Sequence, residues 1–416
     1  MADTYSEVTN TSWFSRLGNS FRGIGMGIVL IVLATFLLYW NEGRAVRTGD
    51  AIAEAQMQTV ELPGISTLDS SYDGKLVHAT GRAITEDNLT DSMFGITANA
   101  IRLRRKVEYY QWVEESRQET RKKLGGGEET VTTYSYQMKW VGQPVESQNF
   151  KQVKDHENRI RIQAANEDQY AANVTFGAYR LPDFLIRSIG GEKAITPNLS
   201  DEQRSEIQKN FFSRAPIDKV NEAAESGAEE VAHGPNSMVH NQGNFLYIGR
   251  RPNSPQVGDV RISFFEVSPA EVSIIAKISG DTFVPFRASN GETFCKLAMG
   301  VQDQTVMFDN AKSSNSMMTW ALRIAGILLC VMGIRTVVAP LQVIADVIPL
   351  LGSIVGAGTG LVAMLLGSAW SFVVIAIAWV RFRPLLGACL LGAAVALIAF
   401  LFVRGRKRKA SAAVQA

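Results

Sequence analysis

The sequence predicts a multi-pass α-helical membrane protein with four transmembrane helices and a large, strand-rich α+β domain outside the membrane. Residues 24–40 and most of residues 317–403 lack the charge density that a water-facing surface needs, whereas residues 44–316 are polar and charged. Within the polar part, apolar and polar residues alternate, which is typical of strands with one buried face. The formal net charge of +2 argues against nucleic acid as a partner, because phosphate neutralisation needs a concentrated basic surface.

The first apolar segment, residues 23–40, has about 18 residues, which at about 1.5 Å each just span the hydrocarbon region. A cleaved signal peptide is the alternative, but its apolar core is typically shorter and ends in small residues. This segment ends at Tyr39 and Trp40, which we interpret as interfacial anchors. We therefore expect a retained transmembrane helix.

The second transmembrane helix is expected over residues 317–339. Arg323 and Arg335 lie near its two ends, where long side chains reach the headgroups and anchor the helix. The next segment, residues 340–352, is apolar except for one narrow polar stripe that contains Asp346. This pattern favours a short interfacial or re-entrant helix, in which Asp346 is either a functional intramembrane charge or a group facing headgroup water.

The third and fourth transmembrane helices are expected over residues 353–380 and 384–403, with a tight Pro-containing corner between them. Gly352, Gly356 and Gly360 are spaced by four, which lets helices approach closely. A phosphate-binding loop is the alternative for this Gly-rich run. We favour helix packing, because the run lacks the required Lys and a preceding soluble strand.

The orientation follows from the basic tail, residues 404–416, which should stay cytoplasmic. With four crossings, residues 1–22 are also cytoplasmic and residues 41–316 form a periplasmic or lumenal domain. The cations that fix this prediction are Arg404, Arg406, Lys407, Arg408 and Lys409.

The outer domain is expected to contain two hairpins. Residues 101–115 pair with residues 131–141 around an exposed loop, and a second hairpin covers residues 259–279. A helix is expected after Ser200, which precedes a polar helical pattern and is expected to cap it. Two related subdomains, about residues 60–180 and 240–310, are suggested by a Gly shortly before a basic strand in each. On the first strand, an exposed basic run is typical of a solvated strand face and contains Arg102, Arg104, Arg105 and Lys106. Contact with an acidic face of a neighbouring copy is the alternative, with Arg102, Arg104 and Lys106 as the candidate contacts.

No constellation of catalytic, cofactor-binding or metal-binding residues is visible. The four histidines lack metal-ligand spacing, and His233 and His240 are better interpreted as exposed loop residues. Only Cys295 lies in the soluble part, so no disulfide framework is expected within one subunit. The sequence therefore predicts a protein that is not an enzyme and needs no cofactor or metal.

Six ordered motifs resemble the transmembrane protein 43 family, also called LUMA, over nearly the whole chain. The resemblance implies four crossings, cytoplasmic ends, a large outer domain and a role in organising membrane protein complexes. Animal members reside in the endoplasmic reticulum and inner nuclear membrane, whereas the Gly-rich third helix is more similar to bacterial members, which favours a bacterial plasma membrane. The motifs are "NEGRAV" (41–46), "GKLVHATG" (74–81), "IRLRRKVEYYQWVEE" (101–115), "TYSYQMKW" (133–140), "VGDVRISF" (257–264) and "NSMMTWALRIAG" (315–326).

Three functional classes follow. The first is a non-enzymatic scaffold that sits in the lipid bilayer, forms a homo-oligomer through Gly-rich helices and exposed strand edges, and holds other membrane proteins. The second is a channel or transporter that uses Asp346, and the third is a membrane-tethered enzyme on the outer domain. Few intramembrane charges and no evident inverted repeat argue against a transporter.

Overall fold

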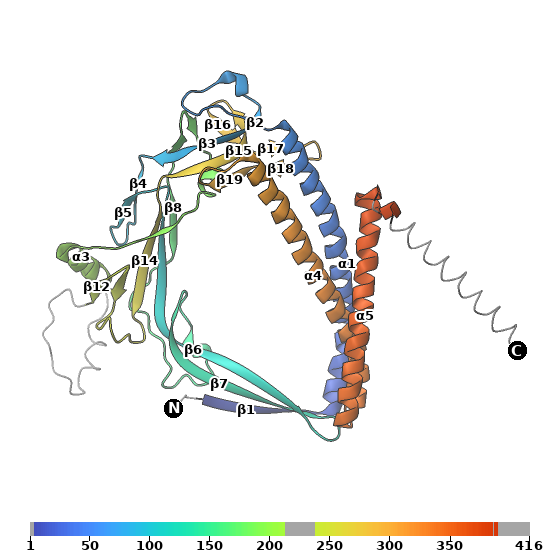
Figure 1. Cartoon of the computed structure of the whole chain (residues 1–416). Helices are drawn as coiled ribbons and strands as arrows, with labels where there is room; N and C mark the ends of the chain where they lie inside the picture. The colour runs from blue at the N-terminus through green and yellow to red at the C-terminus, as the bar shows by residue number, and fades with distance from the viewer. Residues whose placement is uncertain (1–3, 213–237, 386, 390–416) are drawn as a thin grey trace, which may run out of the picture.

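The structure is a computed structural model that describes residues 4–212, 238–385 and 387–389. Three long helices form one side of the molecule and two β-sheets form the other (Figure 1). A long ribbon of strands runs from the sheets to the far end of the helices. The strand-rich domain therefore meets the helices at both ends, and the described chain has the outline of a closed frame.

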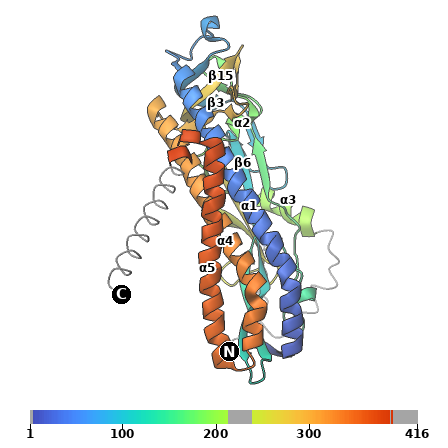
Figure 2. The same cartoon turned by 90° about the vertical axis from the view of Figure 1, so that its right-hand side faces the viewer.

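Among the described residues, three helices are long and apolar enough to cross a membrane. They lie side by side and cover one side of the molecule (Figure 2). The segments predicted at residues 23–40 and 317–339 lie within the first two of them, and both helices extend well beyond these segments. The predicted fourth helix, residues 384–403, falls mostly outside the described residues. The helices are α1 (Trp13–Gln58), α4 (Gln304–Ala345) and α5 (Pro349–Phe382), and two shorter ones are α2 (Asp183–Ile186) and α3 (Asp201–Phe212).

Local sequence explains where the helices begin. The Ser12 hydroxyl accepts a hydrogen bond from the Ser15 N–H at 3.2 Å and caps α1. The Asp303 carboxylate accepts from the Thr305 N–H at 2.7 Å and caps α4. Ser200 caps α3 as predicted, because its hydroxyl accepts from the Gln203 N–H at 3.3 Å.

The structure differs from the expected interfacial helix over residues 340–352. Helix α4 continues through Pro340 to Ala345, and α5 begins at Pro349 after a turn of three residues. The first residue of α5 is a proline, which lacks the N–H that would remain unpaired there. Asp346 therefore lies in a tight turn between two antiparallel helices.

Two large sheets form the strand-rich domain. Sheet A is ordered β1-β7-β6-β14-β13-β12, and sheet B is ordered β19-β15-β16-β10-β9-β3-β2. Sheet A contains β1 (Thr4–Thr11), β6 (Arg102–Lys122), β7 (Glu128–Val141), β12 (Val239–Gln242), β13 (Phe245–Ile248) and β14 (Val260–Val267), with β8 (Glu167–Tyr170) and β11 (Lys193–Ile195) alongside. Sheet B contains β2 (Val60–Glu61), β3 (Leu76–Thr85), β9 (Val174–Phe176), β10 (Tyr179–Arg180), β15 (Ala270–Ser279), β16 (Thr282–Val284) and β19 (Lys296–Met299). Two short pairs are β4 (Asn88–Thr90) with β5 (Thr97–Asn99), and β17 (Phe286–Arg287) with β18 (Thr293–Phe294).

The first predicted hairpin is confirmed, and it is longer than expected. Strands β6 and β7 pair from Tyr109 with Val141 to Lys122 with Glu128, so the loop contains only residues 123–127. The buried face of β6 carries Leu103, Val107 and Tyr109, as the alternation predicts.

The second predicted hairpin is wrong. Strands β14 and β15 follow each other directly in the chain, but β14 pairs with β6 in sheet A and β15 pairs with β3 in sheet B. The short connection at residues 268–269 thus carries the chain from one sheet to the other. Since both sheets take strands from residues 60–180 and from residues 240–310, the chain is not divided into these two subdomains.

An apolar cluster joins the polar end of the long helices to sheet B. Ile52 of α1, Phe308 of α4 and Ile275 of β15 are all buried in it. The Phe294 and Phe308 rings stack at 5.3 Å. The last turns of α1 and the first turns of α4 therefore belong to the core of the strand-rich domain.

Strand β1 was not predicted. It pairs antiparallel with β7 along its whole length, from Thr4 with Ser135 to Thr11 with Glu128. This pairing ties the segment before α1 to the ribbon at residues 128–135.

Candidate functional site: charged clusters on the long helices

Asp346 lies at the point where the ribbon, the start of α1 and the α4–α5 turn meet. Its side chain is fully buried, and each carboxylate oxygen faces its own cation. Oδ2 lies 2.6 Å from Nη2 of Arg16, and Oδ1 lies 2.6 Å from Nζ of Lys122. Arg16 also pairs with Glu128 at 2.7 Å. We call this group of four residues the Asp346 latch.

Backbone contacts surround the latch. The Gly125 N–H donates to the Val347 carbonyl at 3.1 Å, and the Trp13 indole N–H donates to the Val343 carbonyl at 2.8 Å. Gly126 has a φ of +78° and sits against the Trp13 ring, so a Cβ atom there would lie 2.3 Å from it. Glycine is required at this position both for its backbone conformation and for the close contact.

A second charged cluster lies inside the helix bundle, near the other end of its apolar part. Arg323 of α4 forms a bidentate ion pair with Glu42 of α1. Its Nε lies 2.6 Å from Oε1 and its Nη2 lies 2.8 Å from Oε2. The Trp379 indole of α5 donates to the same carboxylate at 2.8 Å, and the Arg323 guanidinium lies over the rings of Trp320 and Trp379. Glu42 is fully buried and Arg323 nearly so. This Glu42 cluster joins all three helices.

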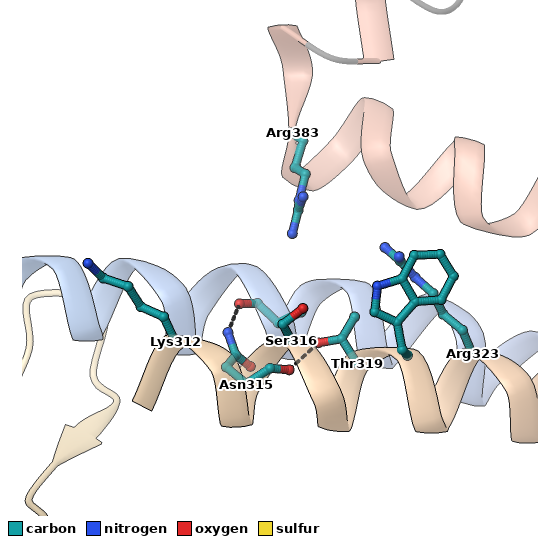
Figure 3. Close-up of a pocket in the computed structure, with 8 residues that line it drawn as sticks. Lys312, Asn315, Ser316, Thr319, Arg323 and Arg383 are labelled. Atoms are coloured by element: carbon teal, nitrogen blue, oxygen red, sulfur yellow. Dashed lines mark hydrogen bonds between the residues drawn. The ribbon is translucent and has the colours of Figure 1, made fainter. Parts of the chain in front are cut away.

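A polar network continues from the Glu42 cluster toward the outer domain. Arg44 donates to Asn315 at 3.0 Å, to Asn41 at 3.2 Å and to Thr319 at 2.9 Å. Asn315 also donates to the Ala45 carbonyl. Figure 3 shows Asn315 and Thr319 on α4, below Arg383 at the end of α5. The contacts between α1 and α4 are therefore polar at the level where the apolar outer surface of the helices ends.

The structure places the three predicted packing glycines differently from one another. A Cβ atom on Gly352 would lie 1.8 Å from an Asp346 oxygen, and one on Gly356 would lie 2.7 Å from the Gln342 amide. Gly360 has open space around its Cβ position. Gly352 and Gly356 therefore pack α5 against α4 within the chain, and Gly367, against Val331, extends this contact.

The predicted membrane anchors lie in different environments. Tyr39 and Trp40 are partly exposed at the end of the apolar part of α1, and Arg335 is exposed on α4. Arg323 is buried in the Glu42 cluster and does not face the bilayer surface. The basic tail falls outside the described residues, with its five cations Arg404, Arg406, Lys407, Arg408 and Lys409.

The cations of β6 are paired within the chain. Arg102 contacts Asp168 at 2.6 Å, Arg104 contacts Glu192 at 2.8 Å and Lys106 contacts Glu108 at 3.2 Å. Their neighbour Arg105, which we grouped with this exposed run, is instead buried. It is held by carboxylates at 2.5 and 2.9 Å, which belong to Asp91 and Glu167.

Within the described ranges, no group of three or more His, Cys, Asp or Glu side chains has the geometry of a metal site. The His78 ring contacts Glu61 at 2.7 Å, and the His240 ring contacts the Gly249 carbonyl at 3.0 Å. Burial raises the pKa of the Cys295 thiol to about 12, so this thiol is neutral at physiological pH and a poor nucleophile. His233 lies outside the described residues.

The sequence analysis did not predict which residues pair with each other in the two charged clusters. Arg16 and Asp346 are 330 residues apart, and Glu42 and Arg323 are 281 residues apart. The only available signal was the presence of charged residues next to or within apolar segments, which predicts a buried partner without identifying it.

The apolar helices, with the charged clusters and the attached sheets, define an integral membrane protein with a strand-rich extramembrane domain. The sequence profile described as Transmembrane protein 43 matches residues 109–384. The chain belongs to this family.

Relatives match over most of their length. Human Transmembrane protein 43 is 29% identical over 406 residues, which cover 95% of this chain and 92% of the human protein. The Drosophila melanogaster Transmembrane protein 43 homolog is 27% identical over 371 residues, covering 88% of this chain and 90% of the fly protein. No solved structure matches the chain.

Proposed function

We propose that this protein is a non-enzymatic membrane scaffold that self-associates and holds other membrane proteins. The observation that carries the proposal is the ribbon formed by β1, β7 and the outer part of β6. Beyond Tyr109, β6 no longer pairs with β14, and its residues 115–121 are exposed. In the outer part of the ribbon, residues 4–11, 115–122 and 128–135, Thr132 is the one buried residue, so this part has little stability of its own. Contact with another copy would bury one of its faces.

The ribbon has two edges that are open in the described part of the chain. Strand β1 is the last strand of sheet A, and the outer part of β6 has a strand on one side only. Open edges template further pairing. We propose that β1 of one copy pairs with β6 of the next, which is a head-to-tail contact and generates a ring or a filament.

The helices support the same proposal. Each exposes a long apolar surface, with Phe36, Leu328 and Leu365 all more than half exposed. Lipid covers such surfaces in a single copy, and helices of other membrane proteins cover them in a complex.

The transporter alternative receives no support from Asp346. Both of its oxygens accept hydrogen bonds from cations, and the residue connects three segments of the chain. We therefore assign it a structural role.

The proposal is tested by the mass of the full chain in lipid nanodiscs, measured by mass photometry. We expect a defined oligomer for the wild type. Val8 is exposed on the edge strand β1, so Val8→Lys places a charge on the open edge and should give the single-copy mass.

Val8→Thr is the matched control, because threonine keeps the strand preference without a charge, and it should keep the oligomer. A wild type with the mass of one copy, or a Val8→Lys variant with the wild-type oligomer, would contradict the proposal.

A further inference from the structure

Two adjoining cavities lie where the apolar surface of the helices ends. Their volumes are about 200 and 420 Å³, and they share lining residues from α1, from α4 and from the residue that follows α5. Figure 3 shows the smaller cavity between α4 and the end of α5, with Arg383 directed toward Asn315 and Ser316. The shared residues are Ala45, Lys312, Asn315 and Arg383.

The lining carries an excess of positive charge. No acidic side chain among the described residues pairs with Arg383, and Lys312 has only a long, exposed contact of 3.6 Å with Asp309. Arg323 also lines the smaller cavity, but Glu42 neutralises it. Asp50 is the one acidic residue in the lining of the two cavities. Two cations with hydroxyl and amide donors nearby favour an anion with several acceptor oxygens, such as a phosphate.

The depth of the cavities indicates where this phosphate comes from. They lie just beyond Tyr39 and Trp40, and Trp320, which is 59% exposed, lines the smaller one. Exposed aromatic side chains at the end of an apolar helix surface are typical of the headgroup layer. A cationic cavity at this level faces the phosphates of the surrounding lipids.

An apolar groove of about 520 Å³ between α1 and α5 lies next to the cavities. Phe36 and Tyr39 line the groove, and Val46 and Asp50 line the larger cavity. Their spacing along α1, continued through Gly43, is three or four residues at each step, so all lie on one face of the helix. The rings of Tyr39 and Phe382, 5.3 Å apart, mark the boundary between groove and cavity.

We propose that the cavities bind the phosphate headgroup of an anionic phospholipid through Lys312 and Arg383, with an acyl chain in the α1–α5 groove. A soluble phosphate fits the charges but leaves the groove without an occupant. A neutral phospholipid fits the groove but offers no net negative charge to the two cations.

The proposal is tested with the full chain in nanodiscs made of equal parts phosphatidylcholine and phosphatidylglycerol. Native mass spectrometry counts the phosphatidylglycerol molecules that the chain keeps after release. The Lys312→Gln/Arg383→Gln variant should bind phosphatidylglycerol about 30-fold more weakly, because each cation near an anionic surface contributes about fivefold. The control variant Arg335→Gln/Arg381→Gln removes the same formal charge outside the cavities and should keep wild-type binding.

Three results would overturn the proposal. The first is equal retention of phosphatidylcholine and phosphatidylglycerol by the wild type. The second is an equal loss in both variants with unchanged thermal unfolding, which would indicate general attraction to the charged surface. The third is release of the bound lipid by excess inorganic phosphate, which would indicate a site for a soluble anion.

Discussion

The Glu42 cluster and the Asp346 latch are two buried charged groups that each take a residue from α1, Glu42 and Arg16, but they join different segments of the chain. The Glu42 cluster joins α1, α4 and α5 inside the bundle, with both carboxylate oxygens bonded to one guanidinium. The Asp346 latch joins the helix turn to the ribbon and to the start of α1, with one cation on each oxygen.

This difference separates the stability of the bundle from the closure of the frame. Removing one partner of a fully buried ion pair leaves an unpaired charge, which is strongly destabilising. In the Glu42 cluster this charge would lie among three packed helices. In the latch, the Lys122 side chain is 26% exposed and the freed cation has access to water. We therefore expect loss of the Glu42 pair to weaken the bundle and loss of the latch to release the ribbon.

The largest effect is expected for Glu42→Gln. Arg323 would be left buried without a carboxylate, which costs about 5 kcal/mol of unfolding free energy, the upper end for a broken buried pair. Thermal unfolding in detergent, followed by the fluorescence of Trp320 and Trp379, measures the loss. The double variant Glu42→Gln/Arg323→Met should recover part of it, since no unpaired charge remains. A double variant as unstable as Glu42→Gln would refute this explanation.

The second effect is expected for Asp346→Asn, at about 3 kcal/mol, because Arg16 keeps Glu128 as a partner. The fluorescence of Trp320 and Trp379 in the folded Asp346→Asn variant should remain close to that of the wild type. Spin labels at Leu124, which is 89% exposed on the ribbon loop, and at Ile344 on α4 report the closure of the frame. Their distance distribution should broaden in Asp346→Asn and change less in Lys122→Gln. A narrow wild-type distribution in Asp346→Asn would show that the latch does not hold the ribbon.

The glycines next to the latch give a smaller effect with a close control. Gly352→Ala places a methyl group on Asp346 and should cost about 2 kcal/mol, as overpacking does. Gly360→Ala meets open space and should be neutral or stabilising, because alanine favours helix. Equal unfolding temperatures for the two variants would refute the packing role of Gly352.

The smallest effect concerns a partly exposed pair in sheet A, for contrast with the buried ones. A hydrogen bond from Arg261 to Glu108 lowers the pKa of this carboxyl below its ordinary value of 4.5, and Lys106 adds to the effect. The pair therefore stabilises the folded state above pH 4.5, and this contribution disappears as the pH falls through the lowered pKa. Glu108→Gln should cost at most about 1 kcal/mol at neutral pH. Its deficit relative to the wild type should vanish in acid, and a constant deficit would contradict this origin.

The periodic parts of the fold were predictable from sequence. Alternation in β6 identified its buried Leu103, Val107 and Tyr109, and apolar length identified the three helices that the structure describes. Strand β1 was not predictable, because Thr4–Thr11 is polar on both faces and has no apolar period. The separation of β14 from β15 was also invisible, since a short connection predicts a hairpin unless the partners are known.

The charged clusters were predictable only as single residues. Asp346 stood out in an apolar segment, but its partners come from the start of α1 and from the β6–β7 ribbon. Arg323 appeared to be a surface anchor because it lies near the end of an apolar run. Its actual partner, Glu42, lies just beyond a different apolar run, and no local pattern connects the two.

The pairing of β1 with β7 has a consequence for biosynthesis. Strand β1 leaves the ribosome before its partner β7, which begins more than 100 residues later, at Glu128. Arg16 pairs with the carboxylate of Asp346, which is synthesised 330 residues later. The frame therefore closes only after the α4–α5 turn has been synthesised, and the N-terminal strand stays unpaired until at least residues 128–135 have been made.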